Sequence, residues 1–281
     1  MFKFLHTFEP QRILYSLGPI SIYWYGFFIV LAIVAGGLVI LRLAKKQNVS
    51  EETIFDLLFW LVLGGLIGAR LYDVLLELPY YMRQPLAILK VWQGGLAVHG
   101  AIVGCAVALF IFAKKRRLDF WLLTALVATA APLAQAIGRL GNYFNQELIG
   151  RPTDLPWGIP IDITNRPLEY LSFQYFHPTF LYESLGNMII FLILLLLINK
   201  TIKSQDSPSR MSNVFVYLIL YSVLRFSLEF IKIDRTPELF GLRWPQIASL
   251  GLVVIALVGL VIINRRRTPA LIDSSKNSLS S

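Results

Sequence analysis

Seven long apolar stretches, separated by shorter polar segments, run along the 281 residues of the chain. Each stretch has about the twenty residues that an α-helix needs to cross the hydrocarbon core of a bilayer. The pattern therefore predicts an all-α polytopic membrane protein. Its seven transmembrane helices are expected at residues 20–42, 54–76, 95–113, 120–140, 179–199, 212–232 and 245–264.

The membrane domain spans residues 20–264 and includes a small cap, and an N-terminal arm and a C-terminal tail flank it. Residues 1–19 mix apolar and charged side chains, which favours an N-terminal arm lying at the membrane interface. The connection 141–178 is the longest and is rich in proline, and a weak apolar–polar alternation over 157–163 favours a short strand pair within a small cap. Residues 265–281 form a polar tail, for which we expect no regular structure.

Basic residues gather in alternate connections, at the C-terminal ends of the first, third, fifth and seventh predicted helices. The positive-inside rule assigns these ends to the cytoplasm. The N-terminus and the cap at about 141–178 are then expected outside the cytoplasm, and the tail 265–281 inside it. The basic residues are Arg42, Lys45 and Lys46; Lys114, Lys115, Arg116 and Arg117; Lys200, Lys203 and Arg210; and Arg265, Arg266 and Arg267.

Composition supports a membrane protein. Hydrophobic residues make up 56% of the chain and charged residues only 15%, whereas a soluble domain has about 25% charged residues. The net charge of +9 indicates basic side chains facing anionic lipid headgroups, with no nucleic acid as partner. The chain has one cysteine, Cys105, and so cannot form an internal disulfide. The first apolar stretch lacks a small-residue cleavage site and is expected to remain as a helix.

Ionisable residues inside the apolar stretches are candidates for function, because they are costly in hydrocarbon. Tyr221, Arg225 and Glu229 follow one another at intervals of four and therefore share one face of a helix. The alternative is an Arg225–Glu229 pair that neutralises itself. Glu183 and Asn187 are spaced in the same way on the preceding helix. Arg70 fits a functional role or a structural tie to a nearby carboxylate equally well. These carboxylates are Asp73 and Glu77.

The segment 138–150 places polar side chains where the fourth apolar stretch ends. Arg139 and Asn142 are three residues apart, so a continuing helix would put them on one face. The alternative is an ordinary helix end, with glycine as terminator and the arginine reaching to the surface. His99 lies among glycines that leave space around it, although a backbone carbonyl could satisfy it. On the residues alone, Tyr25 fits an interfacial anchor beside Tyr23 and Trp24.

Arginines on separate membrane helices need an anionic partner. Phosphate is a good candidate, because a guanidinium group binds it through two parallel hydrogen bonds. Inside a bilayer a phosphate arrives on a lipid. The residues alone therefore predict a phospholipid-handling site.

The segment Gly-Arg-Leu-Gly-Asn-Tyr-Phe-Asn-Gln-Glu-Leu-Ile-Gly at 138–150 resembles the signature of the bacterial phosphatidylglycerol–prolipoprotein diacylglyceryl transferases. That signature reads Gly-Arg-x-Gly-Asn-Phe-x-Asn-x-Glu-x-x-Gly, so Tyr143 replaces one phenylalanine. Three further motifs follow the family's order: Trp-Tyr-Gly at 24–26, Gly-Gly-Leu-Ala-Val-His-Gly at 94–100 and His-Pro-Thr-Phe-Leu-Tyr-Glu at 177–183. The resemblance extends from about residue 23 to residue 229.

The resemblance implies an enzyme of the bacterial inner membrane that uses no cofactor or metal. It would transfer the diacylglyceryl group of phosphatidylglycerol to the lipobox cysteine of a prolipoprotein signal peptide. The products would be a thioether and glycerol 1-phosphate. Such an enzyme must deprotonate a thiol and stabilise the charge of the departing phosphate.

The matching positions supply the candidate site. Arg139 and Arg225 are expected to bind phosphate, and either His99 or Tyr221 is expected to accept the thiol proton. The family's aspartate early in the fourth helix has no counterpart in 122–126, and Asp119 lies too early. The full candidate set is His99, Tyr221, Arg225 and Glu229 for catalysis, and Tyr25, Arg139, Asn142, Glu147 and Gly150 for substrate binding.

Three other classes of membrane protein are alternatives. A transporter or channel would also carry buried arginines. An intramembrane serine protease needs a Gly-x-Ser-x nucleophile paired with a histidine on another helix, which the sequence lacks. A structural scaffold would not need Arg139, His99 and Arg225 together.

Overall fold

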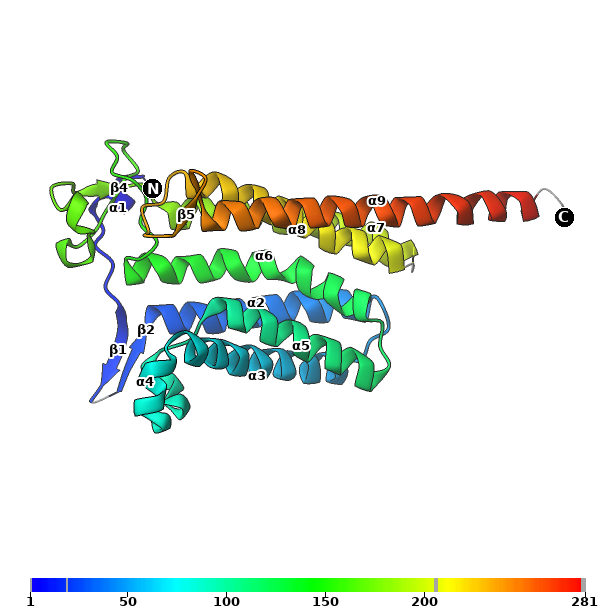
Figure 1. Ribbon diagram of the computed structural model, residues 1–281, viewed down its shortest axis with the longest axis horizontal. Helices are drawn as coiled ribbons and strands as arrows, with labels where there is room; N and C mark the ends of the chain where they lie inside the picture. Colours follow the sequence, from blue (N-terminus) through cyan, green and yellow to red (C-terminus); the bar gives the residue numbers. More distant parts are fainter. Residues whose placement is uncertain (1, 19, 205–206, 279–281) are drawn as a thin grey trace. The chain divides into compact units, whose positions relative to one another are not determined.

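The structure, a computed structural model, describes residues 2–18, 20–204 and 207–278 (Figure 1). Within these ranges, seven helices are long and apolar enough to cross a membrane. The predicted seven-helix, all-α fold is confirmed, and the chain is a multi-pass membrane protein. The seven are α2 (Trp24–Lys45), α3 (Glu51–Leu76), α5 (Val98–Arg116), α6 (Phe120–Asn145), α7 (Thr179–Ser204), α8 (Ser207–Glu229) and α9 (Trp244–Ser278).

The helix ends differ from the predicted ones by a few residues, for local reasons. Ser50 begins α3, because its hydroxyl accepts a hydrogen bond from the amide of Thr53. Arg117 ends α5 in the left-handed conformation, at φ 54°. Helix α6 continues five residues beyond residue 140, so the first half of the 138–150 segment is helical. Helix α9 continues to Ser278, contrary to the expected irregular tail; residues 279–281 of that tail lie outside the described residues.

The chain divides into two compact units, which are described separately here: Met1–Leu38 with Ala128–Ser281, and Val39–Val127. In the second unit α3 packs against α5 through glycines. A Cβ atom at Gly64 would lie 2.9 Å from the carbonyl oxygen of Gly104, and one at Gly68 would lie 2.8 Å from the Cα atom of the same residue. Small residues thus let the two backbones approach closely.

Polar contacts join the helices of the first unit. Helix α8 packs against both α7 and α9. The hydroxyl of Ser184 on α7 donates to the carbonyl of Ala136 on α6 at 2.8 Å. The amide of Asn213 on α8 donates to the hydroxyl of Thr129 on α6 at 3.3 Å. These contacts hold α7 and α8 against α6, and α9 packs on α8.

A small cap follows α6 and precedes α7, as predicted. Strand β3 (Ile159–Pro160) pairs antiparallel with β4 (Tyr175–Phe176), which confirms the expected strand pair. The short helices η3 (Ile163–Asn165) and η4 (Leu168–Tyr170) lie between these strands. The cap has an apolar core composed of Tyr143, Ile149, Ile159, Ile161, Phe176 and Phe180.

Short elements complete both units. In the first, α1 (Phe2–Thr7) packs against β3, and hairpins form from β1 (Ile13–Leu17) with β2 (Ile20–Tyr23) and from β5 (Glu238–Leu239) with β6 (Leu242–Arg243). In the second, α4 (Leu78–Arg83), η1 (Pro85–Leu89) and η2 (Val91–Gln93) connect α3 to α5.

Candidate functional site

A buried carboxylate links α6, α7 and the segment after α8. Glu183 on α7 is only 1% exposed. Its Oε1 lies 2.6 Å from Nη2 of Arg139 on α6. Its Oε2 lies 3.2 Å from Nζ of Lys232. Glu183 therefore holds two cations that come from distant parts of the chain.

A second buried carboxylate, Glu229 at the end of α8, also holds two cations. Its Oε2 lies 3.0 Å from Nη2 of Arg225 and its Oε1 lies 2.9 Å from Nη1 of Arg243. Arg243 also donates to the backbone carbonyls of Glu229 at 3.1 Å and Lys232 at 2.9 Å. The self-neutralising Arg225–Glu229 pair, predicted as the alternative to function, is present in the structure. However, Glu229 also pairs with Arg243, so its charge does not neutralise Arg225 alone.

Arg225 keeps one edge of its guanidinium group available. Its Nη1 is buried and has no hydrogen-bond partner among the described residues. A buried donor of a charged group without an acceptor is costly. Such a donor therefore favours an incoming anion or another strong acceptor at this position.

The polar side chains of 138–150 form a chain of hydrogen bonds. Nη1 of Arg139 donates to Oδ1 of Asn142 at 3.2 Å, which confirms that the two share one face of α6. Nδ2 of Asn142 donates to Oε1 of Glu147 at 2.6 Å. Asn142 thus orients the guanidinium group of Arg139 from one side while Glu183 holds it from the other.

Tyr25 and Tyr221 lie next to this chain of hydrogen bonds. The phenol of Tyr25 lies close enough to Arg139 and Glu147 for electrostatic interaction with both. Its ring packs on Gly141, where a Cβ atom would lie 3.0 Å from it. The phenol of Tyr221 interacts with Arg139, Glu183 and Arg225. The expected polar face of α8 therefore points into the ion-pair cluster, which consists of Glu183, Glu229 and the four cations that they hold: Arg139, Arg225, Lys232 and Arg243.

Gly150 allows two backbone segments to come close together. A Cβ atom there would lie 2.6 Å from the Cβ atom of His177, so no larger residue fits. Gly150 forms an antiparallel bridge with Lys232. The amide of Arg151 donates to the carbonyl of Ile231 at 2.8 Å, and the amide of Ile233 donates to the carbonyl of Ile149 at 3.2 Å. The end of the 138–150 segment therefore fixes the backbone that carries Lys232.

His99 and Arg70 belong to the second unit, whose position relative to the first is not determined. His99 is exposed in the first turn of α5, with its ring 6.1 Å from that of Tyr72. Its approach to the ion-pair cluster stays a prediction. Arg70 donates to the backbone carbonyls of Ile88, Gly94 and Gly95 at 2.8–2.9 Å, which supports a structural role in holding the loop before His99.

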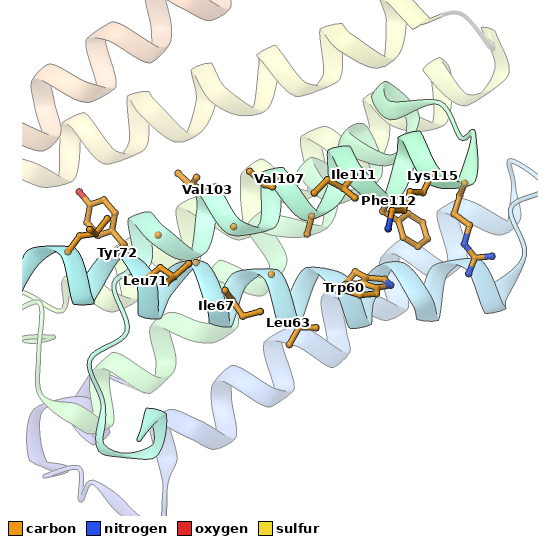
Figure 2. Close-up of a pocket in the computed structure, with 17 residues that line it drawn as sticks. Trp60, Leu63, Ile67, Leu71, Tyr72, Val103, Val107, Ile111, Phe112 and Lys115 are labelled. Carbon is orange, nitrogen blue, oxygen red and sulfur yellow. The ribbon is translucent and has the colours of Figure 1, made fainter. Parts of the chain in front are cut away.

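The second unit also carries an apolar groove of about 700 Å³ between α3 and α5. Figure 2 shows Ile67 and Leu71 on α3 and Val103 and Val107 on α5 along it. Polar side chains occur only toward its two ends, as Tyr72 at one and Lys115 with Arg116 at the other. None of the predicted site residues lines it. The groove therefore lacks the groups that polar chemistry requires.

Sequence reasoning missed two members of the cluster and gave no role to a third. Lys232 falls at the end of a predicted helix, where a lysine is usually an interfacial residue. Arg243 lies in a polar connection and carries no signal of burial. Glu183 stands on an apolar helix, and its need for a cation could have predicted such partners.

Comparison with known proteins covers nearly the whole chain. The family model described as prolipoprotein diacylglyceryl transferase matches residues 12–262. The phosphatidylglycerol–prolipoprotein diacylglyceryl transferase of Nostoc sp. is 41% identical over 277 residues, which are 98% of this chain and 97% of the relative. The enzyme of the same name from Synechococcus elongatus is 42% identical over 253 residues, with 90% and 87% covered. Because this similarity includes the 138–150 segment and every helix of the ion-pair cluster, the chain belongs to the prolipoprotein diacylglyceryl transferase family.

Proposed function

We propose that this protein transfers the diacylglyceryl group of phosphatidylglycerol to the lipobox cysteine of prolipoprotein signal peptides. The observation that carries the proposal is the convergence of Arg139 and Arg225 around Tyr221, with Nη1 of Arg225 buried and unpaired within the described part of the chain. The name of the Nostoc relative supports the same two substrates for this member of the family.

The two arginines bind the lipid phosphate. Glu183 and Glu229 each form an ion pair with one Nη2 atom, and so help to hold the two guanidinium groups in place. The remaining N–H groups can then donate to phosphate oxygens in the paired geometry that a guanidinium group favours. Donors already in place when charge develops on the leaving phosphate lower the energy of the transition state.

The reaction exchanges one bond to carbon for another. The thiolate sulfur attacks the glyceryl carbon that carries the phosphate, and a carbon–sulfur bond forms as the carbon–oxygen bond breaks. The electron pair leaves with oxygen, which gives glycerol 1-phosphate and a thioether. The thiol proton goes to His99 or to Tyr221. The argument for His99 is that histidine accepts protons near neutral pH. The argument for Tyr221 is that its phenol lies in the ion-pair cluster.

The protein works in the bacterial inner membrane with its N-terminus outside and its C-terminus in the cytoplasm. The cluster lies where α6 and α8 end and α7 begins, next to the cap. The basic residues lie at the opposite ends of these helices. By the positive-inside rule the cluster then faces the outer leaflet.

Purified protein in phosphatidylglycerol vesicles tests the proposal. A lipobox peptide should gain the mass of a diacylglyceryl group, and the same peptide with serine for cysteine should not. Vesicles of phosphatidylethanolamine should support much less product. Solute transport without any change in peptide mass would contradict the proposal and favour a transporter.

A further inference from the structure

One polar side chain of α7 has no role in the function proposed above. Asn187 is fully buried, at 0% exposure. Neither its Oδ1 nor its Nδ2 has a hydrogen-bond partner in the described ranges. A buried amide left with none of its hydrogen bonds is costly, and more so among apolar helices. Such a group is expected where something outside the protein supplies the partner.

A hydroxyl on the neighbouring helix has the same property. Ser222 on α8 is 1% exposed, and its Oγ lacks a partner among the residues that the structure describes. The two helices touch at this level, because a Cβ atom at Gly186 would lie 2.5 Å from the side chain of Leu224. Asn187 and Ser222 are therefore neutral hydrogen-bonding groups at one depth of the α7–α8 pair.

The depth of these two groups relative to the arginines suggests what they bind. Asn187 follows Glu183 by four residues, so it lies on the same face of α7 and about 6 Å farther from the cap. Ser222 precedes Arg225 by three residues and also lies farther from the cap. In a phospholipid the ester carbonyls lie a few bonds deeper than the phosphate. A phosphate held by Arg139 and Arg225 would thus place ester carbonyls at this level.

The chemistry of the two side chains fits that ligand. An ester carbonyl is a neutral acceptor, which an amide N–H or a hydroxyl can satisfy without a charge. The hydroxyl groups of the lipid headgroup lie on the other side of the phosphate, toward the cap, and would not reach Asn187. Building on the proposed function, we propose that Asn187 and Ser222 form an ester-carbonyl subsite that makes the protein selective for ester-linked glycerolipids.

Diester and diether phosphatidylglycerol with matched chains provide the test, because only the diester has carbonyls. The wild-type protein should convert the diester about tenfold faster in kcat/KM, the effect of about one hydrogen bond. Asn187→Leu should bring the diester rate down to the diether rate and leave the diether rate near that of wild type. A matched control is Asn199→Leu on the same helix, where the amide already donates to Leu195. It should keep the preference.

A second measurement covers variants that fold poorly or turn over neither lipid. Added diester should raise the Tm of the purified wild-type protein more than added diether does, and Ser222→Ala should reduce this difference. If the wild type makes no lipidated peptide yet shows the difference in Tm, the proposed function fails and the subsite stands. Equal rates and equal Tm shifts for the two lipids in the wild type would overturn the subsite. An Asn187→Leu variant that is more stable and keeps the preference would also overturn it, and would indicate bound water only.

Discussion

Glu183 and Lys232 form an ion pair of 3.2 Å in which both side chains are almost completely buried, at 2% and 1% exposure. The pair joins α7 to the segment after α8. Because Glu183 also holds Arg139, Lys232 acts on the proposed phosphate-binding arginine through one intermediate. Lys232 is therefore a positioning residue, and its backbone is in turn fixed by Gly150.

Lys232→Met should leave Glu183 with one cation in a buried site. Breaking a buried pair on one side costs about 3–5 kcal/mol, so the free energy of unfolding should fall by that order and transfer activity should drop. Lys232→Arg keeps the charge and should retain more of both. Thermal unfolding and the vesicle assay measure these effects. Lys200→Met, at the exposed far end of α7, is the matched control, and an equal loss there would contradict the assignment.

Alkaline pH should inactivate the protein through the same lysine. Burial lowers the pKa of Lys232 below its ordinary value, an effect that Glu183 only partly offsets. As pH rises, the folded protein therefore loses this proton before the unfolded chain does, and Glu183 is left to pair with Arg139 alone, which should shift the guanidinium group of Arg139. The alkaline limb of the activity profile should lie below the ordinary lysine range. Lys232→Arg should move this alkaline limb to higher pH. A limb at the same pH in the variant would show that another group causes the loss of activity.

Gly150→Ala should disturb the site without removing any polar group. Its new Cβ atom would lie 2.6 Å from that of His177, so the bridge to Lys232 must shift. We expect activity to fall at least about tenfold, equivalent to 1.4 kcal/mol in the transition state. Gly251→Ala on α9, where a Cβ atom meets nothing within 4 Å, should be neutral. An active Gly150→Ala protein would show that the close bridge between Gly150 and Lys232 is not needed for activity.

Substitution can decide which group accepts the thiol proton. If His99 is the base, His99→Gln keeps a hydrogen-bonding side chain but loses basicity, and the rate should fall by about 10²–10⁴. Tyr221→Phe should then cost less. The initial rate of peptide lipidation measures both variants. Near-full turnover in His99→Gln together with an inactive Tyr221→Phe would give the role to Tyr221.

The topology can be checked with a reporter that is active only in the cytoplasm. The basic connections predict a signal from a fusion after Arg267 and none from a fusion near Asp154, within the cap. The reverse pattern would contradict both the orientation and the placement of the cluster in the outer leaflet.

The sequence predicts local and periodic features of this protein well. The seven helices follow from apolar length alone, and the contact of Arg139 with Asn142 follows from their spacing on one helix. The partners of Glu183 do not follow from any period, because Lys232 lies 49 residues away in sequence. The bridge at Gly150 and the packing of α7 on α8 bring such residues together.

The proposed role of Arg225 in binding the leaving phosphate can be tested with doubly labelled lipid. Phosphatidylglycerol labelled separately in its phosphate and in its diacylglyceryl group is supplied to wild-type protein, Arg225→Lys and Arg225→Gln with a lipobox peptide. Arg235→Gln is the control, since its pair with Glu169 is exposed.

The wild type and the control should place only the diacylglyceryl label on the peptide and release the phosphate label in equal amount as glycerol phosphate. Arg225→Lys keeps the charge but loses the paired geometry. Arg225→Gln should lose about 2–4 kcal/mol of transition-state stabilisation, a rate loss of roughly 30- to 900-fold. Phosphate label on the peptide, or near-wild-type transfer by Arg225→Gln, would contradict the account.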